Sequence, residues 1–294
     1  EMLGVVGESG SGKSVTALSL MGLLPNPKDT VSASQFIFDG TSMLPFEEKR
    51  FRALRGKKIG MIFQDSMSAL NPSMRCGKQV LEMIRMHSTL NKKESQERML
   101  SLLERVKLPD PKAIAKRYPH QLSGGQQQRV LIAIAIACSP KLLIADEPTT
   151  ALDPEVQQDI MQLLKSIQKQ TQMSILFISH DLNLVQHYAD RVVVLKNGVC
   201  EESGTAEQFF NHPKSPYTKG LINAVPPRNK RPKRLQTVSD FIANTAKTPN
   251  EKAAERKKRH QLLYKQTPVL EVKDVEKVFT QHKQSHRVLK DVCF

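Results

Sequence analysis

The sequence lacks tryptophan, and it is poor in other aromatic residues, in closely spaced cysteines and in long hydrophobic runs. Aromatic side chains make up 5% of the 294 residues, and the four cysteines lie far apart without a Cys-x-x-Cys pair. Neither a zinc site nor a disulfide framework is indicated, so a reducing compartment is the simplest interpretation. The longest apolar run, Val130 to Cys138, is much shorter than the roughly 20 residues that a membrane-spanning helix needs.

The positive charge of the chain is concentrated in one segment. The formal net charge is +15, and the stretch from Arg228 to Lys265 holds twelve Lys or Arg against three Asp or Glu. Because it has few large apolar residues before Leu262, this stretch predicts a mostly disordered linker over residues 228–267. We interpret it first as a solvated tether and second as a segment attracted to anionic lipid head groups. A specific nucleic-acid partner is not expected.

A glycine-rich loop near the start of the sequence predicts a phosphate-binding site. GESGSGKS, from Gly7 to Ser14, fits the pattern G-x-x-x-x-G-K-[ST] of a P-loop, in which backbone N–H groups surround phosphate oxygens. The apolar MLGVV before it reads as a strand and SVTALSLMGLL after it as a helix, so the loop lies at a helix N-terminus. Lys13 is predicted to reach the β and γ phosphates, and Ser14 to ligate Mg²⁺. The predicted ATP contacts of this loop are Gly7, Ser9, Gly10, Ser11, Gly12, Lys13, Ser14 and Val15.

A second helix N-terminus with small residues follows at Leu122 to Gln126, which we call the signature segment. In LSGGQ, small residues again precede a long apolar helix, so backbone donors are exposed there. One chain rarely needs two such anion sites for a single phosphate tail. The candidate contacts are Ser123, Gly124, Gly125 and Gln126.

Two acidic residues stand at the end of an apolar run. LLIA, at 142–145, reads as a core parallel strand that delivers Asp146 and Glu147 at its carboxyl end, where open α/β sheets bind ligands. Asp146 is predicted to hold Mg²⁺. Glu147 is predicted to polarise the attacking water, because phosphoryl transfer to water depends mainly on positioning and charge.

With these motifs in this order, the chain resembles the ATP-binding subunits of ABC transporters. The resemblance implies an ATPase with an α/β P-loop NTPase fold, a RecA-like core and an inserted α-helical subdomain. It implies that the signature segment caps ATP held by the P-loop of a second nucleotide-binding domain. It also implies that Gln64 in MIFQD contacts the metal and the water, that His180 in ISHD contacts the γ-phosphate, and that Asp153 in TTALD lies at the dimer interface.

Three further segments resemble the oligopeptide, dipeptide and nickel importers of this family. FQDSMSALNP, at 63–72, differs from the subfamily's FQDPMTSLNP at Ser66, among other positions, and YPHQLSGG at 118–125 also fits. HPKSPYTKGLINAVP, at 212–226, has Ser215 where a second His is usual. The subfamily implies peptide import with transmembrane permease subunits, which dock in a groove behind the Q-loop glutamine, and indirectly with a periplasmic or extracellular solute-binding protein. It also implies a peripheral location on the cytoplasmic face of the bacterial inner membrane.

The two ends of the sequence predict a piece of a double-domain protein. Residue 1 falls on the strand before the P-loop, so the N-terminal antiparallel β element of the family is expected to be incomplete. Residues 269–294 hold two alternating strand-like runs and resemble the opening of a second domain, with Phe279 at the adenine-stacking position. We expect a fused peptide-importer ATPase of the Yej type. Its parts here are a first domain at 1–227 with a helical subdomain at about 71–138, the linker, and the start of a second domain at 268–294.

Two alternatives are weighed. A tandem-domain ABC protein that acts on the ribosome without a membrane partner would suit two domains and a basic linker, but the segments at 63–72 and 212–226 favour an importer. Separately, residues 269–294 could dock beside Met2 to Val6, because an unpaired sheet edge accepts an added strand.

Overall fold

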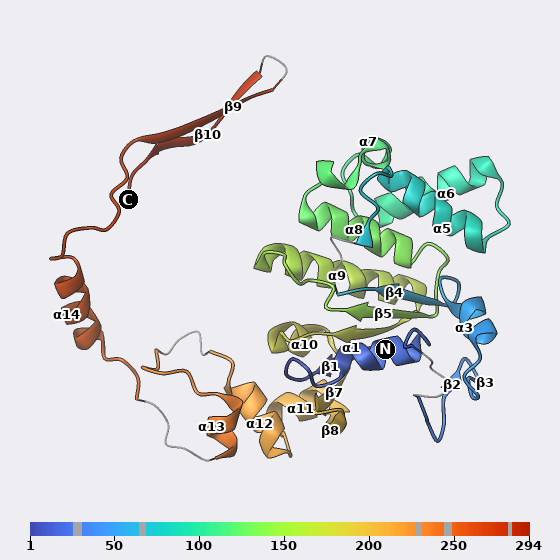
Figure 1. Ribbon diagram of the computed structural model, residues 1–294, viewed down its shortest axis with the longest axis horizontal. Coiled ribbons are helices and arrows are strands. Elements are labelled where there is room, and N and C mark those ends of the chain that lie inside the picture. The colour runs from blue at the N-terminus through green and yellow to red at the C-terminus, as the bar shows by residue number, and fades with distance from the viewer. Residues whose placement is uncertain (26–30, 65–68, 227–230, 244–248, 282–283) are drawn as a thin grey trace. The chain divides into compact units, whose positions relative to one another are not determined.

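The computed structural model describes residues 1–294 except 26–30, 65–68, 227–230, 244–248 and 282–283. Ser66 therefore lies outside the described residues. The chain divides into two compact units (Figure 1). The first comprises 1–225 and 237–245, and the second comprises 226–236 and 246–294.

A six-stranded sheet in the order β4-β5-β6-β1-β7-β8 forms the centre of the first unit. Its strands are β1 (Met2–Val6), β4 (Ile59–Ile62), β5 (Leu142–Asp146), β6 (Ser174–Ile178), β7 (Arg191–Lys196) and β8 (Val199–Thr205). All neighbours pair in parallel except β8, which is antiparallel to β7. β1 is hydrogen-bonded to β6 on one side and to β7 on the other. The expectation that 269–294 extends an open edge beside β1 is therefore wrong.

Helices cover both faces of this sheet, which explains why its parallel strands are continuous apolar runs. One face packs on α1 (Lys13–Leu20) through Ala17, Val5 and Ile144. The other face packs against α8 (Gly124–Ala135), α9 (Pro154–Thr171) and α10 (Leu182–Tyr188). Because both faces of the sheet are covered, a ligand can reach the sheet only at the ends of its strands.

From α5 to α8, the described residues between β4 and β5 form a helical subdomain, as the sequence predicts (Figure 1, cyan to green). Before α8 it contains α5 (Cys76–His87), α6 (Lys92–Arg105), α7 (Pro111–Lys116) and the short 3-10 helix η1 (Pro119–Gln121). α6 begins at a capping box in which the side chains of Asn91 and Glu94 each accept a backbone N–H of the other. The apolar side of this segment is buried, at Met99, Leu102, Leu103 and Val106.

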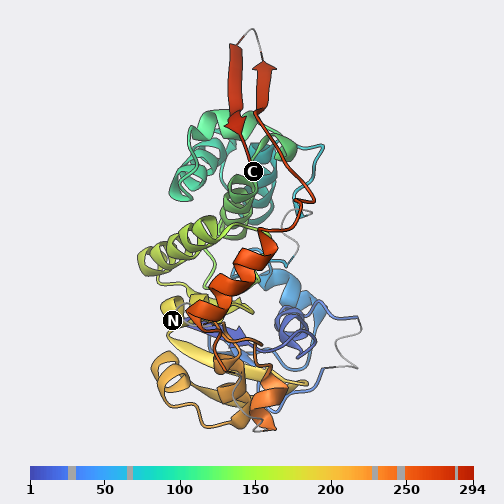
Figure 2. The ribbon, with the colours of Figure 1, turned by 90° about the vertical axis from the view of Figure 1, so that its left-hand side faces the viewer.

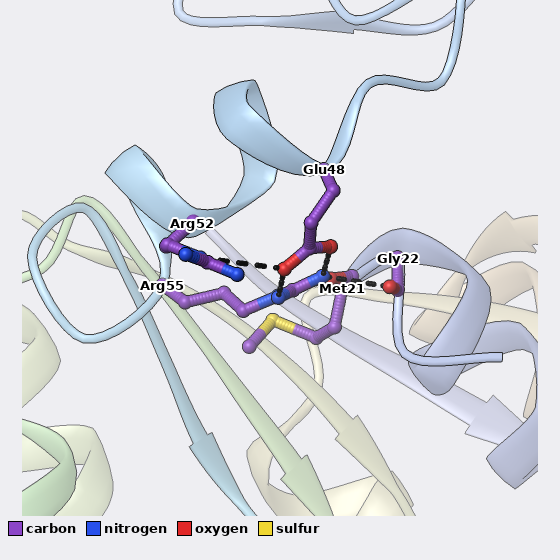
Figure 3. A network of polar contacts seen from close by, with 5 residues as sticks. All are labelled: Met21, Gly22, Glu48, Arg52 and Arg55. Carbon is purple, nitrogen blue, oxygen red and sulfur yellow. Dashed lines mark hydrogen bonds and ion pairs between the residues drawn. The ribbon is translucent and has the colours of Figure 1, made fainter. Parts of the chain in front are cut away.

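An arginine anchors the carboxyl end of α1. β2 (Ile37–Phe38) and β3 (Thr41–Ser42) form a short antiparallel pair, and α3 (Glu48–Leu54) follows. The guanidinium of Arg55 donates to the carbonyl oxygens of Met21 at 2.8 Å and Gly22 at 2.6 Å, and both of its terminal nitrogens bind the Glu48 carboxylate (Figure 3). A cation there satisfies free carbonyls and complements the helix dipole. The helix that starts at the P-loop is thus fixed at its far end.

Part of the predicted linker is helical. α13 (Val238–Ile242) packs on α12 (Pro216–Asn223) close to Gly220, where an added Cβ would lie 3.1 Å from the Val238 side chain. The segment 237–245 therefore belongs to the first unit. α14 (Ala253–Leu263) is a further helix, made mostly of good helix formers. The prediction of a mostly disordered stretch is wrong over these two helices.

The last described elements form a hairpin in the second unit. β9 (Val275–Gln281) and β10 (Gln284–Val292) pair antiparallel, as Figure 2 shows, which confirms the two strand-like runs. Within the described residues they are hydrogen-bonded only to each other, and the Phe279 side chain is exposed. The described part of the chain contains no helix with the length and apolarity that a bilayer crossing requires.

Candidate active site

A cleft of about 500 Å³ opens where α1 meets the carboxyl ends of β4, β5 and β6. Three of its residues follow three adjacent strands, because Gln64, Glu147 and His180 come just after β4, β5 and β6. The sheet order therefore aligns them opposite the P-loop. Among the described residues, the lining consists of Ser9, Gly10, Gly12, Lys13, Ser14, Val15, Gln64, Glu147 and His180.

The backbone of the P-loop requires glycine at both of its ends. Gly7 has φ +153°, and an added Cβ would lie 2.2 Å from the carbonyl oxygen of Leu195 in β7. Gly12 precedes α1 in the left-handed region, with φ +99°. The loop can thus lie against the end of β7 and turn directly into the helix.

Lys13 lies under the loop, and its ammonium is largely shielded from solvent. Its Nζ donates to the carbonyl oxygens of Gly7 and Glu8, both at 2.8 Å. Burial lowers the pKa of Lys13, while the nearby carboxylates of Glu147 and Asp146 raise it. These partners hold a cation where the P-loop pattern predicts phosphate oxygens.

Asp146 is a buried carboxylate with one unsatisfied oxygen. It ends β5 with 3% of its surface exposed, and its Oδ1 has no hydrogen-bond partner among the described residues. Burial raises the pKa of Asp146, as does the charge of Glu147, while the Ser14 hydroxyl and Lys13 lower it. A buried acceptor without a partner costs about 1–3 kcal/mol. This cost favours a cation at Asp146, beside Ser14.

Glu147 is held in an unusual backbone conformation and by several side chains. Its φ is +49°, a region that residues other than glycine rarely adopt and that occurs at functional sites. Its Oε2 accepts a hydrogen bond from the Thr150 hydroxyl at 2.8 Å, and His180 Nδ1 lies 3.3 Å from its Oε1. Burial alone would raise the pKa of Glu147, but hydrogen bonds from Thr150, His180 and Gln64 bring it below its usual value. The carboxylate is therefore ionised and oriented.

Thr150 is a site residue that our sequence analysis missed. It lies three residues after Glu147, in the turn that follows β5, where its backbone N–H also donates to the Glu147 carbonyl at 3.2 Å. In the sequence, the hydroxyl of Thr150 three residues after the Glu147 carboxylate could have indicated this contact.

The signature segment and Asp153 do not line this cleft, but they lie close to each other. Ser123 forms a capping box with Gln126 at the start of α8, and Asp153 accepts a hydrogen bond from the Val156 N–H at the start of α9. An added Cβ on Gly125 would lie 2.8 Å from the Val156 side chain. Two helix N-termini therefore lie together, with exposed polar residues.

An apolar groove of about 660 Å³ adjoins the side of the cleft that holds Gln64. Phe63, which precedes Gln64, lines it, and Met86 on α5 is 71% exposed at it. The remaining lining is mostly aliphatic or methionine, with some polar residues: Met61, Ile62, Ala69, Asn71, Met74, Gln79, Glu82, Met83, Leu131 and Ile134. Flexible methionines on an exposed surface suit the docking of another protein.

The sequence matches known transport proteins in two regions. The family model described as "ABC transporter" matches residues 1–150, and the model "Oligopeptide/dipeptide transporter, C-terminal region" matches residues 202–253. The oligopeptide transport ATP-binding protein OppD of Bacillus subtilis is 47% identical over 226 residues, which are 77% of this chain and 63% of OppD. The dipeptide transport ATP-binding protein DppD of Haemophilus influenzae is 48% identical over 242 residues, covering 82% and 73%.

One relative is much longer than this chain. The peptidoglycan transport ATP-binding protein YejF of Agrobacterium fabrum is 49% identical over 226 residues, 77% of this chain but 41% of YejF. The chain thus spans less than two thirds of OppD and less than half of YejF.

Solved structures share the fold. The dimeric structure of MJ0796, a bacterial ABC transporter cassette, aligns with a TM-score of 0.61 at 30% identity, covering 70% of this chain and 85% of that one. CbiO1 from Clostridium perfringens, part of the ABC transporter complex cbiONQ, aligns with a TM-score of 0.62 at 30% identity, covering 72% and 80%. The expected P-loop NTPase fold with a helical insertion is confirmed.

Proposed function

This chain belongs to the ATP-binding proteins of ABC transporters, of the oligopeptide and dipeptide type, and on that premise we propose that it hydrolyses ATP to power peptide import. One observation carries the catalytic part of the proposal. Lys13, Glu147 and His180, from three distant segments, line a single cleft at the ends of parallel strands.

The P-loop and Lys13 bind the triphosphate. Backbone N–H groups at the start of α1 and the Lys13 ammonium supply positive charge in a partly buried place, which favours a polyanion over water. Ser9, Gly10 and Ser11 continue the loop between the two constrained glycines, and Val15 follows on α1 at the rim. The phosphates thus meet a preformed binding site.

The residues beside the loop fit Mg²⁺. The Ser14 hydroxyl, the Gln64 amide oxygen and the unsatisfied Asp146 carboxylate oxygen are the hard oxygen donors that this ion prefers. When bound, Mg²⁺ neutralises charge on the phosphates. Asp146 would also gain the partner that its buried oxygen lacks.

Glu147 is the residue that we assign to water activation. Its carboxylate is ionised and oriented by Thr150 and His180, so it can accept a hydrogen bond from water and take up a proton as the phosphoryl group transfers. His180 and Gln64 each form a hydrogen bond with Glu147. His180 would contact the γ-phosphate, and Gln64 would contact the metal ion and the attacking water. These three residues form the proposed catalytic group.

A second nucleotide-binding domain would complete the site. We assign Ser123, Gly124, Gly125, Gln126 and Asp153 to nucleotide held by that partner domain. Their position outside the chain's own cleft supports this assignment, as does the proximity of the α8 and α9 N-termini. The β9–β10 hairpin with its exposed Phe279 fits the start of a fused second domain at 268–294.

Peptide cargo and permease partners follow from the relatives' names. Among the relatives compared, the names describe transport ATP-binding proteins, and the C-terminal region matches a peptide-transporter model, so the ribosome-associated alternative lacks support. We propose that permease subunits dock in the apolar groove beside Gln64. The chain would then lie on the cytoplasmic face of the inner membrane, with a solute-binding protein acting from the other side.

Reconstitution tests this function. The full-length protein and the permease subunits would be purified together and placed in vesicles with the solute-binding protein outside. Peptide uptake that requires ATP inside the vesicles supports the proposal. ATP hydrolysis that is unaffected by peptide and permease, with no uptake, contradicts the transport role while leaving the ATPase assignment intact.

A further inference from the structure

A tyrosine from the C-terminal part of the first unit reaches the P-loop. The hydroxyl of Tyr217, on α12, accepts a hydrogen bond from the Glu8 N–H at 3.3 Å and donates one to Glu8 Oε2 at 3.2 Å. Its side chain is 2% exposed. These two residues are 209 positions apart. Tyr217 thus binds both the backbone and the side chain of a P-loop residue.

The charges around Tyr217 favour its role as a donor. Burial raises the pKa of Tyr217, and the Glu8 carboxylate adds to this effect, although the backbone bond from Glu8 lowers it. The hydroxyl therefore keeps its proton. The ammonium of Lys196 lies 4.8 Å from the centre of the Tyr217 ring, which adds a cation–π contact.

The first turn of α12 is itself fixed. The Ser215 hydroxyl accepts from the Tyr217 N–H at 3.1 Å and donates to Glu201 on β8 at 2.6 Å. The Glu202 carboxylate accepts backbone N–H groups of Lys214 and Ser215. Serine is a preferred N-cap residue, which gives a physical role to the position where the importer pattern has histidine. The tyrosine is thus presented from a rigid helix start.

The β7–β8 turn supports the same loop. Asn197 and Gly198 both have positive φ, at +48° and +80°, which is typical of a tight hairpin turn. The Gly198 N–H donates to the Ser11 carbonyl at 3.0 Å. The Glu8 carbonyl in turn accepts from Lys13 Nζ. A continuous set of contacts therefore leads from α12 through Glu8 to the cation of the site.

We propose that Tyr217 is a positioning residue for the triphosphate of the bound nucleotide. By fixing Glu8, it holds the P-loop in the conformation that presents Lys13 and the loop N–H groups to phosphate oxygens. A loop that is ordered beforehand loses less conformational entropy on binding. The C-terminal region of the first unit therefore contributes to ATP affinity. This inference rests on the proposed ATPase function.

The test compares two substitutions that each remove one hydroxyl. Tyr217→Phe keeps the buried ring beside Lys196 and deletes both bonds to Glu8. Tyr188→Phe is the matched control, because its hydroxyl donates to the Gln158 carbonyl on α9 and not to the P-loop. We expect about tenfold weaker ATP binding for Tyr217→Phe, with kcat changed less than about threefold, and unchanged binding for Tyr188→Phe.

Binding is measured by displacement of a fluorescent ATP analogue, well below the unfolding temperature of every variant, and kcat and KM by phosphate release. A double-mutant cycle with Glu8→Ala adds a readout that general destabilisation does not move. We expect the loss caused by Tyr217→Phe to be smaller when Glu8 is already alanine. Wild-type ATP affinity in Tyr217→Phe, or additive losses in the cycle, would overturn the inference. A wild-type chain that binds no ATP would remove the proposed function itself.

Discussion

His180 Nδ1 lies 3.3 Å from Oε1 of Glu147, although the two residues follow different strands. The contact exists because β5 and β6 are parallel neighbours that end at the same edge of the sheet. The Glu147 N–H donates to the Ile178 carbonyl at the end of β6, which fixes the two strand ends together. The orientation of the proposed catalytic carboxylate is thus set by the backbone as well as by side chains.

Glu147→Gln should bind ATP but hydrolyse it at least about 100-fold more slowly, because general base catalysis typically contributes that much or more. Nucleotide binding and single-turnover phosphate release, measured on the full-length protein with the site resolved, would check this. Glu155→Gln, an exposed substitution in the first turn of α9, is the control. Unchanged turnover at the substituted site would refute the assignment of Glu147.

Thr150→Val should move the acid limb of the pH–rate profile to higher pH. The folded-state pKa of Glu147 is depressed in part by the Thr150 hydrogen bond, so removing that bond raises it and the base becomes protonated at a higher pH. By the same linkage, stability from this carboxylate is present above its unfolded pKa and is lost as pH falls through the folded pKa. The profile of kcat/KM against pH is the measurement.

Thr171→Val serves as the control for that profile, because its hydroxyl donates to the Ile167 carbonyl within α9. Its acid limb should match that of the wild type. An unshifted profile in Thr150→Val would mean that this hydroxyl does not set the protonation of the base.

Lys13→Ala should weaken ATP binding as well as hydrolysis, because it removes the ammonium that Gly7 and Glu8 hold under the loop. Lys93→Ala, on the exposed side of α6, is the control for loss of one positive charge. Titration with a fluorescent nucleotide measures the change. Equal affinities in the two variants would contradict the phosphate-binding role of Lys13.

Arg55→Ala should destabilise the first unit by about 1–3 kcal/mol, because buried carbonyl oxygens of Met21 and Gly22 lose their donor. Arg52→Ala, whose side chain is 80% exposed at 3.7 Å from Glu48, should cost no more than about 0.5 kcal/mol. Urea unfolding of both variants measures the difference. Similar midpoints would show that the Arg55 network adds no net stability.

Local patterns in the sequence were sufficient for the strand and helix on either side of the P-loop, for the helix after the signature segment and for the strand that ends at Asp146. Near-continuous apolar runs identified β1 and β5, and the polar residues that follow β5 identified one edge of the sheet. The same reasoning located Asp146 and Glu147, because a ligand site at strand ends is a general property of parallel sheets. Gln64 and His180 were different, since only the resemblance to a family linked them to this edge.

Contacts between distant segments were beyond the sequence. Nothing in the local pattern links Tyr217 to Glu8, because their proximity depends on how α12 starts from Ser215 against β8. The helices α13 and α14 were missed for another reason. Basic composition predicts disorder on average, yet Val238 and Phe241 find a partner surface at Gly220, and the α14 sequence has high helix propensity.

The packing of α13 on α12 changes how much chain separates the first unit from the hairpin that begins at Val275. The stretch that joins them starts after residue 245 and contains α14, which advances only about 1.5 Å per residue, where extended chain would span roughly 3.3 Å. A shorter linker raises the effective concentration of one linked domain near the other, provided that the linker is long enough for the two domains to meet. In the proposed fused protein, pairing with the second nucleotide-binding domain would then depend on whether α13 stays docked, and a charge at Val238 would favour release of α13 from α12 and so lengthen the connection.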